Sequence, residues 1–529
     1  MSHINFRSVL TLSFSTFIGL SLVACGDDGS YGGAYETAGY DDSSANSAGN
    51  PGTSAGTATA GEGGVTDGGD SAGTDGGTSG GDTDTGSTSG GEQACDAASP
   101  VTLFLSPDDS NSMSSPVQAR EAVLDGFGSL AYVPLRVWEF FNYYSFDYPP
   151  APAGTIVVTP ELYRPEGSPE GQYVLQIGVT SEAMPNADRP PMNVTLVLDE
   201  SGSMEGRSME LLQESCRAIA ASLKKGDLVS MVGWDTANAV KLSGYAVTGP
   251  NDATLLAEID DLAAGGGTDL NGGLTAGYDL ATKSFDPSRI NRVVLISDGG
   301  ANAGVTDIDI IAKGATANGM DGIYMVGVGV GTVDIYNDTL MDTVTDAGKG
   351  ASVYVSDEDE AWKVFGTDFV STMAVAARDV QVRLDMPPGF EIVSFSGEEY
   401  SANAAEIEPQ HLAPNDTMVF HQTIRTCAPE LVADDTPITV TARYKDAITF
   451  EQKEVQQTVT FGQLLGLPSP LIRKGAAVWA YTEALKAARA EAPDVSQKVA
   501  EFGARIGDAL SLMPGDPDLA EMKAVIDAL

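Results

Sequence analysis

Oxygen-bearing side chains gather at three places in the middle of the chain. The first place holds Asp199, Ser201 and Ser203 at alternate positions. The second holds Thr268, in a glycine-rich turn, and the third holds Asp298. Two carboxylates and three hydroxyls, with no thiolate or imidazole, form a hard donor set that suits magnesium, manganese or calcium and does not suit zinc or copper. If the fold brings them together, these residues predict a site for a divalent cation.

The sequence predicts that these places follow strands or precede helices of one sheet. Residues 194–198 and 293–296 form mostly apolar runs, typical of buried parallel strands. Thr268 follows three glycines that allow a tight turn, and it precedes a predicted helix at 270–283. In an open parallel sheet, ligands bind beyond the carboxyl ends of the strands. We therefore expect the three places to converge.

The five residues resemble the metal-ion-dependent adhesion site of the von Willebrand factor type A (vWA) domain. That site has the pattern Asp-x-Ser-x-Ser, then a Thr, then an Asp, which here falls on Asp199, Ser201, Ser203, Thr268 and Asp298. The resemblance implies that the three hydroxyls ligate Mg²⁺ (or Mn²⁺ or Ca²⁺) directly and that the acids act directly or through water. It also implies an open coordination position that accepts a ligand's carboxylate, within a Rossmann-like α/β fold. Binding, and no catalysis, is the implied role.

Two further acidic positions carry weaker signals. Asp108, Ser110 and Ser112 repeat the Asp-x-Ser-x-Ser spacing, but no Thr and Asp turns follow them in sheet order, so we predict a capped loop there. Asp235 follows the apolar run 229–234. It either orients a metal ligand or caps a turn.

Strands with alternating apolar and polar residues flank the predicted vWA domain on both sides. This period of two predicts an antiparallel β-sandwich that is split in the sequence, with the mostly parallel vWA sheet inserted into it. An Ala-, Leu- and Lys-rich end predicts closing helices. Together these parts resemble bacterial vWA lipoproteins. The predicted parts begin with an N-terminal helical segment specific to that family (98–150). The sandwich follows in two pieces (151–188 and 372–468), with the vWA domain (189–371) between them. A C-terminal helical segment (469–529) ends the chain.

The amino terminus predicts export and a lipid anchor. Residues 1–24 combine Arg7 with an apolar stretch, and the run Leu22-Val23-Ala24-Cys25 resembles the lipobox of bacterial lipoproteins. The resemblance implies that Cys25 is lipidated and that the mature protein sits at the outer membrane of the cell envelope, on its periplasmic or its surface side. An uncleaved anchor or a simple secretory signal is the alternative. Residues 25–97, rich in Gly, Ser, Thr and Asp, predict a disordered tether.

Composition excludes several classes of function. The chain has 529 residues, with 29 Lys and Arg against 74 Asp and Glu, so its net charge of -45 repels nucleic acid and anionic lipid surfaces. Four cysteines are too few for a disulfide scaffold. Cys216 lies on the apolar face of a predicted helix, which indicates a core residue. With Cys25 lipidated, Cys95 and Cys427 remain as the candidate pair for one disulfide.

Three functions remain open. The favoured one is a lipid-anchored protein that captures an acidic group of a protein ligand through a divalent cation, with no other membrane contact and no nucleic-acid partner. A scaffold of an envelope complex, whose vWA domain does not exchange ligands, is the first alternative. The second is a hydrolase that uses Ser201 or Ser203. Because no HExxH motif, no P-loop and no nearby histidine would activate these serines, we expect no enzymatic activity.

Overall fold

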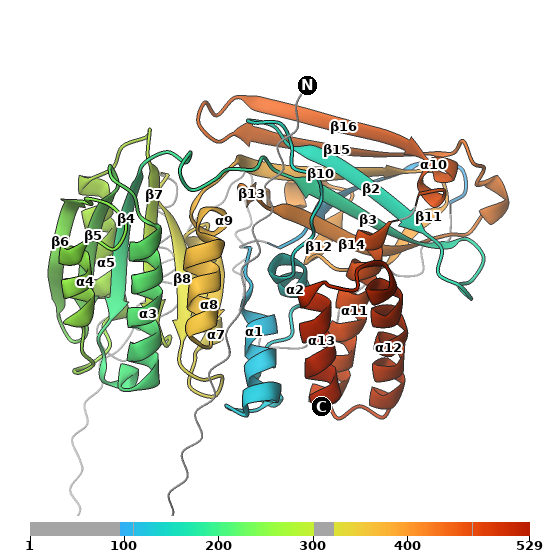
Figure 1. Cartoon of the computed structure of the whole chain (residues 1–529). Coiled ribbons are helices and arrows are strands. Elements are labelled where there is room, and N and C mark those ends of the chain that lie inside the picture. The colour runs from blue at the N-terminus through green and yellow to red at the C-terminus, as the bar shows by residue number, and fades with distance from the viewer. Residues whose placement is uncertain (1–95, 109–110, 301–321, 468) are drawn as a thin grey trace, which may run out of the picture. The chain divides into compact units, whose positions relative to one another are not determined.

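The computed structural model describes residues 96–108, 111–300, 322–467 and 469–529. These residues form two antiparallel sheets, one mixed sheet, and helices at both ends of the folded chain (Figure 1). The predicted signal segment, lipidated Cys25 and tether lie outside the described residues. None of the described helices is both long enough and apolar enough to cross a bilayer.

The two antiparallel sheets form a sandwich with one shared core. Val380, Val382 and Leu384 of β10 alternate with polar residues and belong to this core together with side chains of the second sheet. The first sheet has the order β12-β1-β10-β15-β16, with β13 also paired to β10, and contains β1 (Val101–Ser106), β10 (Ala377–Met386), β12 (Glu399–Ser401), β13 (Gln410–Leu412), β15 (Pro437–Asp446) and β16 (Gln452–Thr460). The second has the order β11-β14-β3-β2 and contains β2 (Val157–Tyr163), β3 (Gln172–Thr180), β11 (Phe390–Phe395) and β14 (Thr417–Thr426).

The segment that was expected to be helical, residues 98–150, begins instead with a strand of the sandwich. Leu103 of β1 lies opposite Leu384 of β10, and β1 also pairs with β12. The apolar side chains of β1 pack against the sandwich core because they alternate along it. The rest of this segment is helical and comprises α1 (Ser114–Arg120), η1 (Glu121–Asp125), η2 (Leu130–Tyr132) and α2 (Val137–Tyr143).

The mixed sheet lies in sequence between β3 and β10, so its domain is inserted into the sandwich, as predicted. Its order is β6-β5-β4-β7-β8-β9, in which β6 runs antiparallel to β5 and the other neighbours are parallel. We call residues 192–373 the mixed-sheet domain. Its strands are β4 (Met192–Asp199), β5 (Leu228–Trp234), β6 (Asn238–Ala246), β7 (Ile290–Ser297), β8 (Tyr324–Val330) and β9 (Ser352–Val355).

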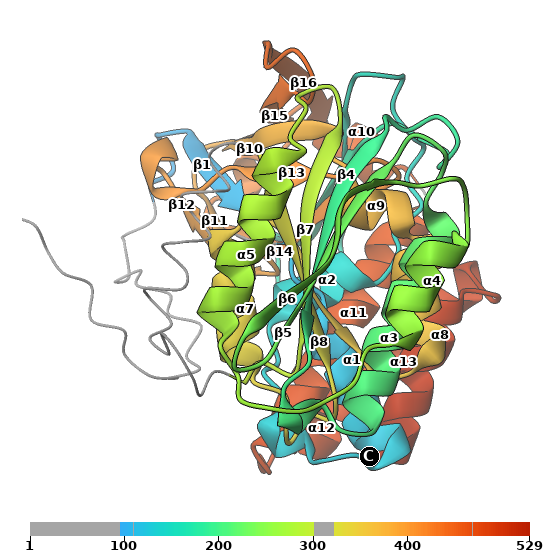
Figure 2. The same cartoon turned by 90° about the vertical axis from the view of Figure 1, so that its left-hand side faces the viewer.

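Helices cover both faces of the mixed sheet because its buried strands present apolar side chains to both faces. In β4, Leu196 and Leu198 face the core under α3, whereas Val197 faces the core under α5. Figure 2 shows α5 and α7 on one side of the sheet and α3 and α4 on the other. The described helices are α3 (Arg207–Ser222), α4 (Ala253–Asp260), α5 (Leu270–Lys283), α7 (Asp338–Ala347), α8 (Glu358–Trp362), η4 (Lys363–Thr367) and α9 (Phe369–Met373).

The chain closes with helices that pack against the N-terminal helical segment. Tyr481 of α11 meets Phe140 of α2 edge to face, with ring centroids 5.6 Å apart. Arg120, at the end of α1, bonds Glu360 of α8 at 2.7 Å and Glu521 of α13 at 3.0 Å. The N-terminal helical segment therefore contacts both the mixed-sheet domain and the closing helices, which are α10 (Phe461–Leu465), α11 (Pro470–Arg489), α12 (Val495–Leu512) and α13 (Pro517–Ala528).

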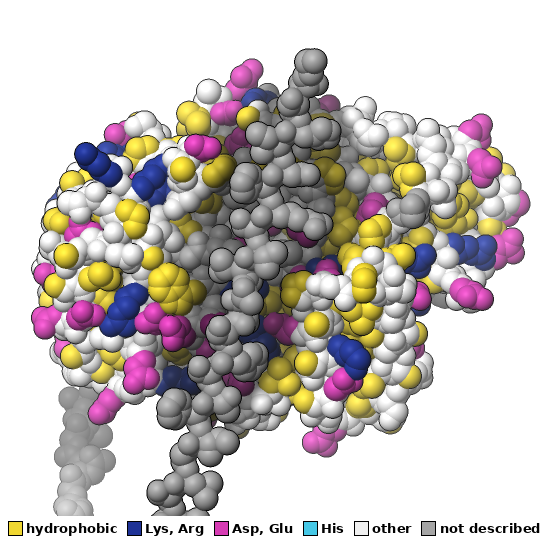
Figure 3. Space-filling view, viewed as in Figure 1, with side chains coloured by type: hydrophobic (Ala, Val, Ile, Leu, Met, Phe, Trp, Pro, Cys, Tyr) yellow, Lys and Arg dark blue, Asp and Glu magenta, His cyan; other side chains and the backbone are white. Residues whose placement is uncertain are grey.

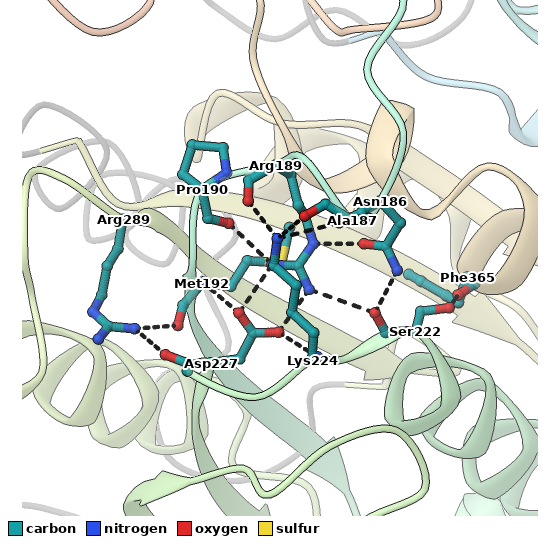
Figure 4. A network of polar contacts seen from close by, with 11 residues as sticks. Asn186, Ala187, Arg189, Pro190, Met192, Ser222, Lys224, Asp227, Arg289 and Phe365 are labelled. Atoms are coloured by element: carbon teal, nitrogen blue, oxygen red, sulfur yellow. Dashed lines mark hydrogen bonds and ion pairs between the residues drawn. The ribbon is translucent and has the colours of Figure 1, made fainter.

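A buried ion pair holds the linker that leads from the sandwich into the mixed-sheet domain (Figure 4). Arg189 in the linker donates to both carboxylate oxygens of Asp227, at 2.9 and 2.6 Å, and neither side chain is exposed. The backbone N–H groups of Met192 and Lys224 donate to the same carboxylate at 2.8 and 2.7 Å. Burial alone would raise the pKa of Asp227, but these hydrogen bonds outweigh it and hold the pKa below its usual value.

Two of the four cysteines lie in the described residues. Cys216 is free and fully buried in α3, and burial raises the pKa of its thiol, so it is a core residue as predicted. Cys427 is disulfide-bonded. Its predicted partner, Cys95, lies outside the described residues. Ala97, two residues further along, lies near Cys427, because both are close to Gly389. A Cβ on Gly389 would lie 3.3 Å from Cys427 Sγ and 3.5 Å from the Cα of Ala97.

Candidate metal centre

The three predicted places are loops at one edge of the mixed sheet. Asp199 is the last residue of β4, and Asp298 directly follows the neighbouring parallel strand β7. The loop that carries Thr268 leads into α5 and touches the first loop, because Gly202 N–H donates to Gly266 O at 3.3 Å. Parallel strands thus place all three loops together, as the sequence predicted.

Hydrogen bonds orient the side chains of the first loop. Asp199 is fully buried, and its Oδ1 accepts from Ser201 N–H at 2.9 Å. Its Oδ2 accepts from Ser297 Oγ at 2.6 Å. The hydroxyl oxygens of Ser201 and Ser203 lie 3.1 Å apart. Both carboxylate oxygens of Asp199 are therefore fixed, and the two serine hydroxyls are neighbours.

The remaining predicted ligands surround a single point next to this loop. A Cβ built on Gly300 would lie 3.2 Å from Asp298 Oδ1, 3.4 Å from Thr268 Cγ2 and 3.7 Å from Ser203 Oγ. Ser203 is exposed, whereas the other predicted ligands are buried. The structure thus brings all five predicted residues to one place that opens to solvent at Ser203. Their role as metal ligands stays a prediction.

The electrostatics of this place fit a cation. Asp298 Oδ1 accepts from Gly300 N–H at 3.1 Å, but the other carboxylate oxygen of Asp298 is buried without a hydrogen-bond partner in the described part of the chain. Burial, with a smaller contribution from the nearby Asp298, raises the pKa of Asp199 to about 6. Two close buried carboxylates, one with an orphaned oxygen, are costly without a positive charge between them. The hydroxyls supply further hard donors, so the residues fit the predicted ion.

No cluster of three or more His, Cys, Asp or Glu side chains that could hold a metal occurs among the described residues. The candidate centre has only two carboxylates, Asp199 and Asp298, so its other donors are hydroxyls. Sequence reasoning did not assign a role to Ser297, which orients Asp199. The signal that could have indicated this role is the place of Ser297 at the end of β7, directly before Asp298.

The weaker acidic positions have structural roles. Asp235 Oδ1 accepts from Ala237 N–H at 2.8 Å, so it caps a turn. Its Oδ2 lies beside Gly266 of the loop that carries Thr268, and its predicted role in orienting a metal ligand stays a prediction. Asp108 is buried and accepts from Ser112 N–H at 2.7 Å and from Asn142 Nδ2 at 2.8 Å. This is the capped loop that was predicted for the second Asp-x-Ser-x-Ser copy, whose Ser110 lies outside the described residues.

The N-terminal helical segment supports the loop of Asp298 through α7. Asn337 N–H donates to the backbone oxygen of Asp298 at 3.0 Å, and the Asn337 side chain caps α7. The next residue, Asp338, accepts from Arg136 Nη2 at 2.5 Å and from Gln118 Nε2 at 2.8 Å. Sequence patterns gave no signal for this arrangement, because its contacts join residues about 200 positions apart.

The same segment also supports the helix that follows the first loop. Arg207, the first residue of α3, lies over the ring of Phe127 at 4.5 Å, and its Nη2 is 3.4 Å from Glu121 Oε1. Glu121 is fully buried and also accepts from the hydroxyl of Tyr354 at 2.6 Å. Burial raises the pKa of Glu121 to about 7, although the hydrogen bond from Tyr354 and the charge of Arg207 lower it.

The substitution Glu121→Gln should flatten the pH dependence of stability. Because folding raises the pKa of this carboxyl from 4.5 to about 7, the folded state keeps a proton that the unfolded state loses, so the free energy of unfolding falls as pH rises through that window. At about 1.4 kcal/mol per pKa unit, the wild type loses on the order of 1–3 kcal/mol between pH 5 and 8 through this group. Glutamine cannot ionise and should keep that stability. Urea unfolding at both pH values measures the difference. The exposed Glu210→Gln is the control, and a variant that follows the wild type would contradict the prediction.

The sequence of the mixed-sheet domain matches a known family. Residues 193–367 match the family model described as von Willebrand factor type A domain. The chain contains a vWA domain. The match begins in β4 and includes all three loops of the candidate centre. The predicted fold class, a mostly parallel vWA sheet between helices with antiparallel sheets elsewhere and C-terminal helices, is confirmed.

Proteins similar to this chain occur in bacteria. Uncharacterized protein YfbK of Escherichia coli (strain K12) is 25% identical over 381 residues, which are 66% of this chain and 66% of that protein. Uncharacterized protein sll0103 of Synechocystis sp. is 26% identical over 222 residues, which are 42% of this chain and 51% of that protein. A solved structure, von Willebrand factor type A from Catenulispora acidiphila, has a TM-score of 0.42 at 17% identity and covers 70% of this chain and 88% of its own.

Proposed function

We propose that this vWA protein captures a carboxylate of a protein ligand through a divalent cation, Mg²⁺ or in its place Mn²⁺ or Ca²⁺. The ion would be held by the five predicted ligands, Asp199, Ser201, Ser203, Thr268 and Asp298. The observation that carries the proposal is Asp298, whose Oδ2 is buried with no hydrogen-bond partner among the described residues and whose side chain lies beside Thr268 and Ser203. A cation at this point would satisfy that oxygen and both carboxylate charges.

The donor set favours binding of an outside anion. Two carboxylates neutralise a divalent ion only formally, and the hydroxyls add no charge, so the ion would stay attractive to a third carboxylate. Ser203 is the exposed member of the set, so an incoming ligand would approach on its side. Hydrogen bonds from Ser201 and Ser297 already fix Asp199, which preorganises the site and lowers the cost of binding.

Exposed apolar side chains next to the centre suggest what accompanies the carboxylate. Phe127 and Ile335 are 42% and 57% exposed. Ile335 lies two residues before Asn337, which bonds the backbone of Asp298, and the loop of Phe127 packs on the same turn, since a Cβ on Gly128 would lie 2.3 Å from Val333 Cγ2. We therefore propose a ligand whose acidic residue is flanked by apolar residues.

The proposed location is the bacterial outer membrane, through a lipid on Cys25. The support is the sequence run from Leu22 to Cys25, which resembles a lipobox. A lipid anchor and a long tether would hold the vWA domain near a membrane without any spanning helix.

A binding role has more support than hydrolysis by Ser201 or Ser203. Of the three histidines, His411 and His421 are described, and both belong to the sandwich. His421 Nδ1 is 2.8 Å from Gln176 Oε1. Neither imidazole lies beside the two serines, so no described histidine can act as their base.

A peptide-display experiment on the purified full chain tests the proposed function. The library should vary one central position between Asp, Glu, Asn and Gln, with apolar or polar neighbours. We expect retention of acidic peptides with apolar neighbours in magnesium, and at least about tenfold less retention after chelation or after change to the amide. Retention that ignores both magnesium and the carboxylate would contradict the proposal. Retention of no peptide at all would favour the scaffold alternative.

A further inference from the structure

A second candidate binding site lies far from the metal centre, where the vWA domain, the sandwich and the N-terminal helical segment meet. A cavity of about 210 Å³ is lined by residues of all three parts. Arg292 of the vWA domain belongs to its wall, and it precedes Asp298 by six residues along β7, which corresponds to roughly 20 Å. One water needs about 10–15 Å³ by a comparable measure, so the cavity has room for a small organic molecule.

Arg292 is a buried cation without a counter-ion. It is 5% exposed, its Nε donates to Met373 O at 2.7 Å, and its guanidinium lies 5.3 Å from the ring centroid of Tyr324. No carboxylate of the described residues forms an ion pair with it, and its two terminal nitrogens have no hydrogen-bond partner there. Burying an unpaired guanidinium is costly, so its position calls for an anion.

Other cations surround the same end of the cavity. The guanidinium of Arg378 also lies over the ring of Tyr324, 5.0 Å from the ring centroid. Lys349 lines both the cavity and an adjoining hollow, and it has no ion pair among the described residues. His411 beside them is neutral, because burial and the nearby Arg378 lower its pKa to about 3. Its Nδ1 accepts from Asp379 N–H at 3.2 Å, and its Nε2 is buried with no partner among the described residues. Arg292, Arg378 and Lys349 thus gather around His411 in a chain with 29 basic and 74 acidic residues, whose acidic side chains spread over the face seen in Figure 3.

The acidic groups of the region form no ion pair with Arg292 or Lys349 in the described part of the chain, although Asp379 Oδ1 lies 3.9 Å from His411 Nδ1. Glu360 is paired with Arg120 at 2.7 Å, and Asp379 is paired with Lys445 at 2.6 Å. Asp147, Asp368 and Asp416 also line the cavity, and none of them bonds Arg292 or Lys349. The wall further contains the apolar side chains of Met113, Val117, Val353, Val364 and Met418.

We propose that this cavity binds a small organic anion, with its carboxylate or phosphate group held by Arg292 and Lys349 and its apolar part against the aliphatic wall. The guanidinium would supply two parallel donors to the anion, which is the geometry that arginine offers to carboxylates and phosphates. The proposed site shares no residue with the metal centre and does not depend on it.

Thermal unfolding and calorimetry of the metal-depleted full chain test the proposal. The probes are benzoate, inorganic phosphate and, as the neutral control, benzamide, all compared with sodium chloride at equal ionic strength. We expect one of the two anions to raise the unfolding temperature of the wild type in a saturable way, and the chloride and benzamide to leave it unchanged. Stabilisation by benzoate identifies a carboxylate site, and stabilisation by phosphate identifies a phosphate site. Stabilisation by neither anion would overturn the proposal.

Two variants separate a binding role of the arginine from a structural one. Arg292→Met should unfold without anion at a temperature equal to or above that of the wild type, because an unpaired buried charge is removed, and should bind the effective anion at least about tenfold more weakly. Lys349→Ala, on an exposed loop residue, should keep the fold and weaken anion binding severalfold. If Arg292→Met does not fold, Lys349→Ala decides. Unchanged anion affinity in the folded variants would overturn the proposal. Because the experiment contains no metal, its result does not depend on whether the proposed metal-bridged function is correct.

Discussion

Replacing Asp298 by asparagine should lower the affinity of the vWA domain for magnesium by more than about a hundredfold. Loss of a residue that only orients a metal ligand already costs roughly 10–100-fold, and Asp298 offers a charged oxygen itself. Asparagine keeps the shape of the side chain and can still accept from Gly300 N–H, which bonds Asp298 Oδ1 at 3.1 Å. The amide, however, removes one of the only two carboxylate charges at the centre.

The same variant should be at least as stable as the wild type when no metal is present. No described residue bonds the buried second carboxylate oxygen of Asp298, and the charge of Asp298 contributes to the raised pKa of Asp199. Removing it relieves both costs. At a hundred times the dissociation constant, magnesium should stabilise the wild type by about 2.7 kcal/mol, and this gain should vanish in the variant. Calorimetry gives the affinity, and thermal unfolding with and without magnesium gives the gain.

Asp252→Asn is the control, because Asp252 belongs to the same domain but caps α4, where its Oδ1 accepts from Thr254 N–H at 3.0 Å. It should bind magnesium like the wild type. Equal magnesium binding by Asp298→Asn and the wild type would remove the metal centre from these loops. A loss of binding together with lower stability in the absence of metal would instead show that Asp298 serves the fold.

The sequence predicted that the loops of the candidate centre converge because each loop adjoins a local pattern in the sequence. Asp199 and Asp298 directly follow runs of buried residues, and strands of that kind are parallel and end at one edge. The alternation in β10 and β15 likewise predicted the sandwich. The sequence could not predict the partners of β1, since its six residues alternate in a way that fits several sheets and its partner β10 lies more than 270 residues further along the chain.

Contacts between distant loops were out of reach for the same reason. Arg136 bonds Asp338 because two helices meet in space, and neither residue belongs to a periodic pattern that marks the meeting. Arg292 lies in an apolar strand, where a single charged residue gives no hint of a cavity beside it. Periodicity predicts elements and their faces, whereas the pairing of side chains between elements depends on packing that only the three-dimensional structure supplies.

The ion pair of Arg189 and Asp227 is such a pairing, and its loss should be the most destabilising single change outside the apolar cores. Asp227→Ala leaves the Arg189 guanidinium buried without a charge partner, and breaking a buried pair in this way costs about 3–5 kcal/mol. It also leaves the N–H groups of Met192 and Lys224 without their acceptor. The affected linker and turn lie where the chain enters the vWA domain (Figure 4). Urea unfolding should show the loss as a lower midpoint.

Two comparisons separate this effect from a general cost of removing charge. Arg217→Ala breaks a pair with Asp260, whose side chain is 65% exposed, and should cost about 0–1 kcal/mol. Replacing both partners by apolar residues, Arg189→Met with Asp227→Leu, should recover much of the stability lost in Asp227→Ala, because no charge then remains buried. A double variant as unstable as the single one would mean that the hydrogen bonds to the linker backbone, and not the unpaired charge, dominate. Asp227→Ala with the stability of Arg217→Ala would mean that water reaches Arg189 once the carboxylate is gone.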